Sequence, residues 1–221
     1  LLDLTDRDIL GIFARLNTYS VSLNKQELFN AKYFGYFKQL VYSLSGDYYT
    51  FWIENKIFTD RKIMRMAEAE LVTDLLIAII AGIQSKKSAE KYYQLYDEEF
   101  ENRKEIEANF SDIMNLIGNL FEGTLRDSNF RTVPNFYGVF VALYHMNYGI
   151  PNLNVERHII TSKDYPKVRN CFDDINCVFE MEEVPKEYFD FLKSTKDATT
   201  DVPARTTRCE FISQRFLEVL E

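Results

Sequence analysis

The sequence predicts an all-α fold, a multi-helix orthogonal bundle of about eight to ten helices. Apolar residues recur at intervals of three and four through most of the 221 residues, which is the spacing of one helix face. No segment of useful length alternates apolar and polar residues with the period of two that a half-buried strand shows. Only eight glycines and five prolines are present, and this scarcity favours long helices with short connections.

The N-terminal part begins with a helix that Thr5 caps and that ends at the polar stretch "NTYSVS". Asn24 and Glu27 then have the spacing of a capping box, so a second helix is expected to start there and to run to about Gly46. We expect this second helix to be continuous and to bury one apolar face. That face comprises Leu28, Ala31, Tyr33, Phe34, Tyr36, Phe37, Leu40, Val41 and Leu44.

Three helices are predicted in the middle of the chain. Residues 63–83 are expected to form one helix, polar at its start and apolar on all sides at its end. Residues 88–123 keep a helical rhythm, with a break near Glu101–Asn102 left open. Pro134 stands near the first position of an apolar helix that ends at Gly149.

The C-terminal part predicts helices at about residues 167–180, after Pro185 and after Pro203. The last of these places Cys209, Ile212, Phe216 and Leu220 on one face. We expect one helical domain over residues 1–221, with a subdomain break near residue 150 left open.

Charge and composition exclude several classes of protein. The net charge of −8 and the pI near 5.0 disfavour a chain whose whole surface binds phosphate, so a nucleic-acid contact would require a local basic patch. The longest apolar run, residues 75–83, is far shorter than the roughly 20 residues that span a bilayer. Three cysteines without a CxxC pair, expected to be small buried hydrophobes, fit a reducing compartment. We therefore expect a cytoplasmic chain with no membrane partner, cut from a longer protein because the initiator methionine is missing.

Residues that could carry chemistry are few. His145 and His158 are the two histidines, and no metal-binding spacing surrounds them, so no metal site is predicted. His145 is expected to be a hydrogen-bonded histidine of the core or of its edge. Glu70 and Asp74 stand one helical turn apart, where they would either share a metal or belong to a solvated face. A weak phosphate contact is predicted at two residues on one side of the last helix, an ordinary charged outer face being the alternative. These two residues are Arg205 and Arg208.

The stretch from Phe13 to Gly35 concentrates polar residues around one bend. A guanidinium precedes the turn, and two amides and a carboxylate follow it within two helical turns. The bend is either a self-contained polar brace, in which Arg15 binds Glu27, or one wall of a ligand site. Its candidate residues are Arg15, Asn17, Thr18, Gln26, Glu27 and Asn30.

The segment "IFARLNTYSVSLNKQELFNAKYFG" resembles the hallmark segment of the GmrSD-type proteins, also known as domain of unknown function 262. The usual form of that segment is close to F-x-R-[IL]-N-[ST]-x-x-x-x-L-x-x-Q-E-L-R-N-A. Phe29 stands where the family commonly has arginine, and residues 19–21 replace a frequent Gly-Gly run. The matching residues are Phe13, Arg15, Leu16, Asn17, Thr18, Leu23, Gln26, Glu27, Leu28, Asn30 and Ala31.

The resemblance implies a helical module of a prokaryotic restriction or anti-phage protein. Family members begin with a ParB/sulfiredoxin-like domain that carries a D-G-Q-Q-R motif, which this sequence lacks. The resemblance therefore implies that the chain lies downstream of that domain, is not catalytic alone and needs no cofactor itself. It also implies that the parent protein is an NTP-dependent nuclease or NTPase that uses an NTP with magnesium. The implied partners are the upstream domain and, through the parent, DNA; a homo-oligomer is left open. In this view the six candidate residues of the bend border the nucleotide or DNA site.

A different class of function also fits the sequence. The aromatic group Tyr48, Tyr49, Phe51 and Trp52 would serve a non-catalytic protein–protein interaction domain if it were exposed. The same residues would equally suit a core, which is the interpretation we favour. Whether the chain alone is an enzyme is left uncertain.

Overall fold

The computed structural model describes residues 22–220, and in that range it consists of eleven α-helices without a strand. The all-α prediction is confirmed, with one helix more than the upper end of the expected range. The helix predicted after Thr5 lies outside the described residues. The helices are α2 (Lys25–Lys32), α3 (Tyr36–Asp47), α4 (Tyr49–Glu54), α5 (Asp60–Ile63), α6 (Ala67–Ala81), α7 (Ala89–Leu95), α8 (Arg103–Phe121), α9 (Val133–Tyr148), α10 (Tyr165–Val178), α11 (Phe189–Lys196) and α12 (Val202–Leu220).

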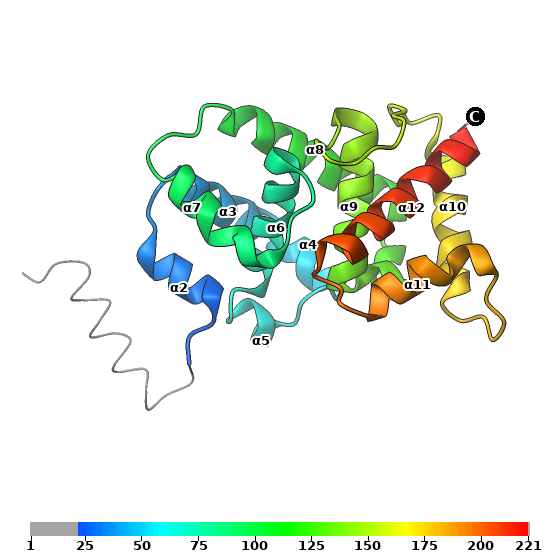
Figure 1. Cartoon of the computed structure of the whole chain (residues 1–221), viewed down its shortest axis with the longest axis horizontal. Coiled ribbons are helices and arrows are strands. Elements are labelled where there is room, and N and C mark those ends of the chain that lie inside the picture. The colour runs from blue at the N-terminus through cyan, green and yellow to red at the C-terminus, as the bar shows by residue number, and fades with distance from the viewer. Residues whose placement is uncertain (1–21, 221) are drawn as a thin grey trace, which may run out of the picture.

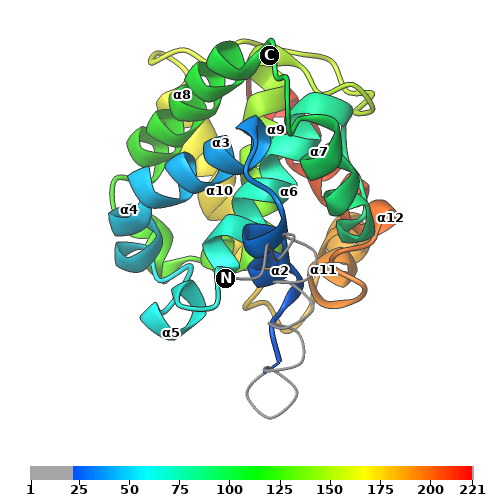
Figure 2. The same cartoon turned by 90° about the vertical axis from the view of Figure 1, so that its left-hand side faces the viewer.

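Two helices, α6 and α9, lie at the centre of the bundle (Figures 1 and 2). Both are apolar on nearly all sides, and nearly every residue of 69–79 and of 135–146 is buried. Helix α6 packs against α3 and α9, while α9 also packs against α8 and α12. A helix without a polar face has to be enclosed by its neighbours, and the amphipathic helices α8, α10 and α12 supply that cover.

The predicted second helix is interrupted between Lys32 and Tyr36, which corrects the expectation of one continuous helix. Gly35 lies against the end of α7, where its amide donates to Asp97 Oδ1 at 2.7 Å. The next two amides, of Tyr36 and Phe37, donate to the backbone carbonyls of Asp97 and Tyr96. A Cβ at residue 35 would lie 1.8 Å from the Asp97 carbonyl oxygen, so only glycine permits this approach.

The interruption rotates part of the expected apolar face into solvent. Leu28, Phe34 and Tyr36 are 45%, 68% and 44% exposed, contrary to the prediction. The residues of α3 on the same stripe, such as Phe37 and Leu44, are buried as predicted.

The predicted helix 63–83 is also two elements. Met66 adopts the left-handed conformation, with φ of 60°, and this separates the short α5 from α6. Tyr42 Oη donates to Met66 Sδ at 3.3 Å, which ties the bend to α3. Residues 88–123 divide as well, with α7 ending at Leu95 and α8 starting at Arg103.

The C-terminal helices close the bundle. Phe172 of α10 meets Phe216 of α12 edge-on with ring centroids 5.2 Å apart, and Cys209 and Ile212 are fully buried as predicted. Buried residues on both sides of residue 150 belong to one hydrophobic cluster. Cys171 is buried but Cys177 is exposed, which corrects the expectation of three buried cysteines. Within residues 22–220, none of the helices has the length and apolar character needed to cross a bilayer.

Candidate functional site

The candidate residues of the bend divide into two groups. Arg15, Asn17 and Thr18 lie outside the described residues. Gln26, Glu27 and Asn30 lie on α2, and each can be placed by its contacts.

The start of α2 is a closed polar brace. The Glu27 amide donates to Asn24 Oδ1 at 2.9 Å, and the Asn24 amide donates to Glu27 Oε2 at 2.7 Å, so the predicted capping box is present. Arg65 completes the brace from the link between α5 and α6. Its Nε lies 2.8 Å from Glu27 Oε1, and its Nη2 donates to the carbonyl of Ser22 at 2.9 Å.

Gln26 points inward. It is 4% exposed, and its Nε2 donates to Tyr93 Oη at 2.7 Å. Tyr93 Oη lies 2.9 Å from Thr73 Oγ1, so one chain of hydrogen bonds joins α2, α7 and α6. Burial raises the pKa of the Tyr93 hydroxyl, which keeps it protonated and able to take part in this chain.

Asn30 contributes through its backbone. Its carbonyl accepts a hydrogen bond from Lys38 Nζ at 2.8 Å. The contacts of Gln26, Glu27 and Asn30 are thus those of a brace between helices, with Arg65 in the role that the sequence suggested for Arg15.

A groove with basic walls, here called the basic groove, lies beside the brace. It has a volume of about 610 Å³ and runs between the start of α2 and the segment from Thr59 to Glu70. Among residues 22–220, four cationic side chains line it and one carboxylate, that of Glu70. Arg65 is held by Glu27, whereas the other three cations are exposed. These three are Lys25, Arg61 and Lys62.

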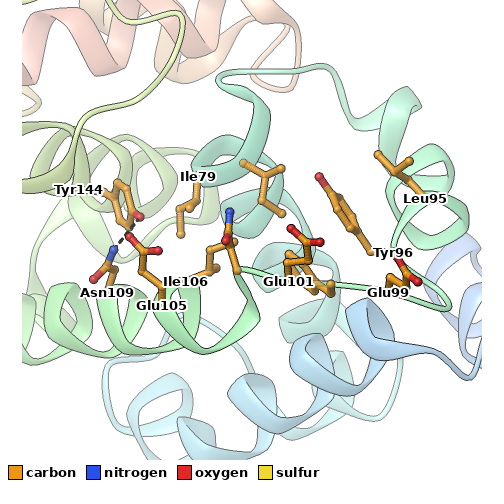
Figure 3. Close-up of a pocket in the computed structure, with 12 residues that line it drawn as sticks. Ile79, Leu95, Tyr96, Glu99, Glu101, Glu105, Ile106, Asn109 and Tyr144 are labelled. Carbon is orange, nitrogen blue, oxygen red and sulfur yellow. Dashed lines mark hydrogen bonds between the residues drawn. The ribbon is translucent and has the colours of Figure 1, made fainter.

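A second groove of opposite charge lies between α6, α7, α8 and α9 (Figure 3). This acidic groove has a volume of about 580 Å³, and its lining contains three carboxylates and no basic side chain. Leu95 is 58% exposed at one end, and at the other Asn109 Nδ2 donates to Tyr144 Oη at 3.5 Å. The carboxylates belong to Glu99, Glu101 and Glu105.

Arg205 and Arg208 are buried. The sequence predicted either a phosphate contact or a charged outer face at these residues, and both predictions assumed exposed side chains, which is wrong. Arg205 is 4% and Arg208 0% exposed. Arg205 Nη2 donates to Asp74 Oδ2 at 2.6 Å, and its Nη1 donates to the carbonyl of Gln84 at 2.8 Å. Arg208 donates to the backbone carbonyls of Ser194 and Thr199.

Glu70 and Asp74 are bridged by a cation from the protein itself. Lys86 Nζ lies 3.2 Å from Glu70 Oε1 and 3.9 Å from Asp74 Oδ2. Burial raises the pKa of the Asp74 carboxyl, and the cations of Arg205 and Lys86 oppose that rise. In residues 22–220 no three histidine, cysteine or acidic side chains gather as a metal site would require.

Two other sequence candidates lie in the interior. His145 is 3% exposed; its Nδ1 accepts from the Ile150 amide at 3.1 Å, so its Nε2 donates to the Val155 carbonyl at 2.8 Å. The interpretation as a hydrogen-bonded core histidine is confirmed. Trp52 is fully buried and donates to the Ser45 carbonyl, which confirms the core assignment at this residue. Tyr49 of the same aromatic group is 47% exposed, which corrects that assignment there.

The basic groove was only partly visible in the sequence. Arg61, Lys62 and Arg65 stand out as the cluster "DRKIMR", but their place opposite the start of α2 depends on the left-handed turn at Met66. Lys25 carried no signal beyond its charge.

No protein-family model, curated protein or solved structure matches the chain. The fold and the grooves define an all-α module with one basic and one acidic groove. The resemblance of the bend to the GmrSD-type segment therefore depends on the quoted residues alone.

Proposed function

We propose that the chain is a non-catalytic helical module of a GmrSD-type restriction or anti-phage protein. Its task is to hold the phosphates of a nucleotide or of DNA at the basic groove, next to the ParB-like domain that the resemblance places upstream. The observation that carries the proposal is the gathering of Lys25, Arg61, Lys62 and Arg65 around one groove on a chain of net charge −8.

The brace supports this role by fixing the position of the groove's two walls. Arg65 binds the Ser22 carbonyl and the Glu27 carboxylate, and Asn24 Nδ2 donates to the Arg65 carbonyl at 2.7 Å. The start of α2 and the α5–α6 link are thereby held together, so the backbone positions that carry the exposed cations keep a common spacing. Fixed cations bind phosphate better than freely moving ones because less side-chain entropy is lost.

The basic residues of the groove suit phosphate oxygens and not bases. Lysine and arginine side chains contact the sugar–phosphate backbone without reading sequence. Sequence or modification specificity would then belong to another part of the parent protein.

A protein–protein interaction module is the second candidate, and one observation favours it. The acidic groove combines three carboxylates with the exposed Leu95, which suits a basic peptide segment. This candidate predicts that the chain itself does not bind DNA.

The test is a titration of the chain against fluorescein-labelled duplex DNA, followed by fluorescence anisotropy at several salt concentrations. Lys25→Glu, Arg61→Glu and Lys62→Glu are combined in one variant, and Arg65 is left intact because it belongs to the brace. Each phosphate contact contributes slightly under one unit to the slope of log K against log salt, so the slope should fall by roughly three.

The matched control carries the same change of charge at the other end of the molecule. Lys163→Glu, Lys167→Glu and Lys186→Glu alter exposed residues on and near α10 and α11, away from α2 in Figure 1. Equal loss of affinity in both variants would show a non-specific charge effect and refute the groove. No binding by the unaltered chain favours the interaction module instead.

A further inference from the structure

A small cavity that is partly open to solvent lies between α6, α9 and α12. Its lining includes the side chains of Lys86, Tyr137, Arg205 and Arg208, with the loop residues Thr199 and Thr200 at one edge. Its volume is about 30 Å³. A single water-sized sphere needs roughly 10–15 Å³, so the cavity has room for a small ion.

The charges around this cavity do not balance. Three cations line it, and Asp74 is the one carboxylate in the lining. Asp74 is already engaged by Arg205 at 2.6 Å. Lys86 also reaches Glu70 at 3.2 Å, but the Glu70 side chain is 49% exposed.

Among the cavity's three cations, the positive charge of Arg208 has the least compensation from neighbouring groups. It is fully buried, and the partners of its two terminal nitrogens are neutral backbone carbonyls. Its Nε has no acceptor within the described part of the chain. A buried cation without an anionic partner is costly, and an unsatisfied buried N–H adds to that cost.

Tyr137 supplies a second unsatisfied donor. Its side chain lines the cavity, is 2% exposed and stacks under the Arg205 guanidinium, which lies 4.5 Å from the ring centroid. The Arg205 guanidinium can donate to the Tyr137 hydroxyl oxygen, but the O–H itself has no acceptor among residues 22–220. Two residues with an unsatisfied buried donor, Arg208 and Tyr137, thus line one small cavity together with an excess of positive charge.

We propose that this cavity is a binding site for one chloride ion. A monatomic anion satisfies donors from several directions, fits the volume and neutralises the excess charge beside Arg208. The site is distinct from the basic groove, although Lys86 in its lining pairs with Glu70, which lines that groove. Its effect is to fix α12 and the loop at residues 197–201 onto α9 and α6.

The direct test uses bromide, which replaces chloride and scatters anomalously. Crystals of the chain are grown with sodium bromide as the only halide, and data are collected at the bromine edge. We expect an anomalous peak in the cavity between Lys86, Tyr137 and Arg208. A cavity that contains water or nothing, with bromide peaks only at the surface, overturns the proposal.

A measurement in solution separates a true site from binding at crystal concentration only. The melting temperature is followed while gluconate, which is too large for the cavity, is exchanged for chloride at constant ionic strength. A ligand that binds only the folded state raises the melting temperature with its concentration. An unchanged melting temperature across the exchange overturns the proposal even if a crystal peak is present.

Variants of neighbouring lysines test the location. Lys86→Gln removes one cavity cation near the protein surface, and it is preferred over Arg208→Gln, which removes a fully buried guanidinium and threatens folding. Lys87→Gln makes the same change of charge at an exposed neighbour. The chloride dependence should weaken in Lys86→Gln and persist in Lys87→Gln, and equal slopes in the two variants contradict the proposal.

Discussion

Two arginine–carboxylate pairs in this protein have the same chemistry and opposite surroundings. Arg205 and Asp74 approach to 2.6 Å, with side chains 5% and 6% exposed. Arg65 and Glu27 approach to 2.8 Å, with side chains 39% and 15% exposed. The distances are nearly equal, so burial and not the distance between the charges distinguishes the two pairs, and we expect the core to depend on the buried pair.

The two pairs differ in how well water could solvate the carboxylate if its arginine were removed. Asp74 lies on α6 in the centre of the bundle, and without Arg205 its charge would stay largely desolvated. Glu27 lies at a helix start and accepts a second hydrogen bond, from the Asn24 amide, so loss of Arg65 leaves it partly satisfied. Exposed pairs also lose strength to screening by salt.

The largest expected effect follows from removing the buried guanidinium. Arg205→Met keeps an unbranched chain but leaves Asp74 without its main partner. Breaking a buried ion pair from one side costs about 3–5 kcal/mol, so the free energy of unfolding in urea should fall by about that amount. The midpoint of the urea transition should shift with an unchanged slope.

The counterpart variant Arg65→Met makes the same substitution in the exposed pair. Partly exposed pairs contribute about 1 kcal/mol or less, and the remaining loss should shrink as salt is added. A loss in Arg65→Met as large as that in Arg205→Met would mean that burial does not govern these pairs.

The next effect concerns the cap of α2. Asn24→Ala removes the acceptor of the Glu27 amide and the donor to the Arg65 carbonyl. Loss of an N-cap costs about 1 kcal/mol, so thermal unfolding should occur at a lower temperature by a few degrees. Comparing this loss of stability with that of Arg65→Met shows whether the start of α2 is stabilised more by its helix cap or by its ion pair.

Ser22→Ala is the control for the cap. Ser22 is exposed, and its contact with Arg65 is made by the backbone carbonyl, which the substitution retains. The change in the free energy of unfolding should stay within about 0.5 kcal/mol. A cap variant that behaves like Ser22→Ala would argue against the brace.

The sequence predicted the elements that local chemistry determines. The all-α class, the capping box at Asn24 and the buried stripe of the last helix follow from spacing and side-chain type, and the structure confirms them. The break at Gly35 was missed because its cause is the Asp97 carbonyl, 62 positions along the chain. The periodicity of residues 28–44 continues through the break and therefore gave no warning.

The positions of the charged groups were least predictable. Arg205 and Arg208 have the spacing of a helix surface. Nothing in the sequence indicates that α6 and the Gln84 carbonyl bind Arg205, or that α11 and the loop after it cover Arg208. Arg65 was visible as part of a basic cluster, but its pairing with Glu27 joins residues 38 positions apart. Long-range pairings of this kind depend on how the helices cross, and the apolar pattern alone does not specify the crossing.

His145 extends the comparison to a buried polar group that carries no charge. Its Nδ1 accepts from the Ile150 amide, so protonation would break that hydrogen bond inside the core. Burial lowers the pKa of His145 below its ordinary 6.5, and the charge of Arg157 acts in the same direction. The unfolded chain therefore binds this proton more readily than the folded chain.

The sign of the pH dependence follows from this difference. Stability from His145 is fully present above about pH 6.5 and is lost as the pH falls below that value, because protons then favour the unfolded state. Between about pH 6.5 and pH 5, above the range where most carboxylates titrate, urea unfolding should show decreasing stability. His145→Asn should flatten this slope, whereas His158→Asn, at an exposed residue, should retain it. If the slope persists in His145→Asn, another group causes the loss of stability at acidic pH. Burial of His145 would then not explain the pH dependence of the free energy of unfolding.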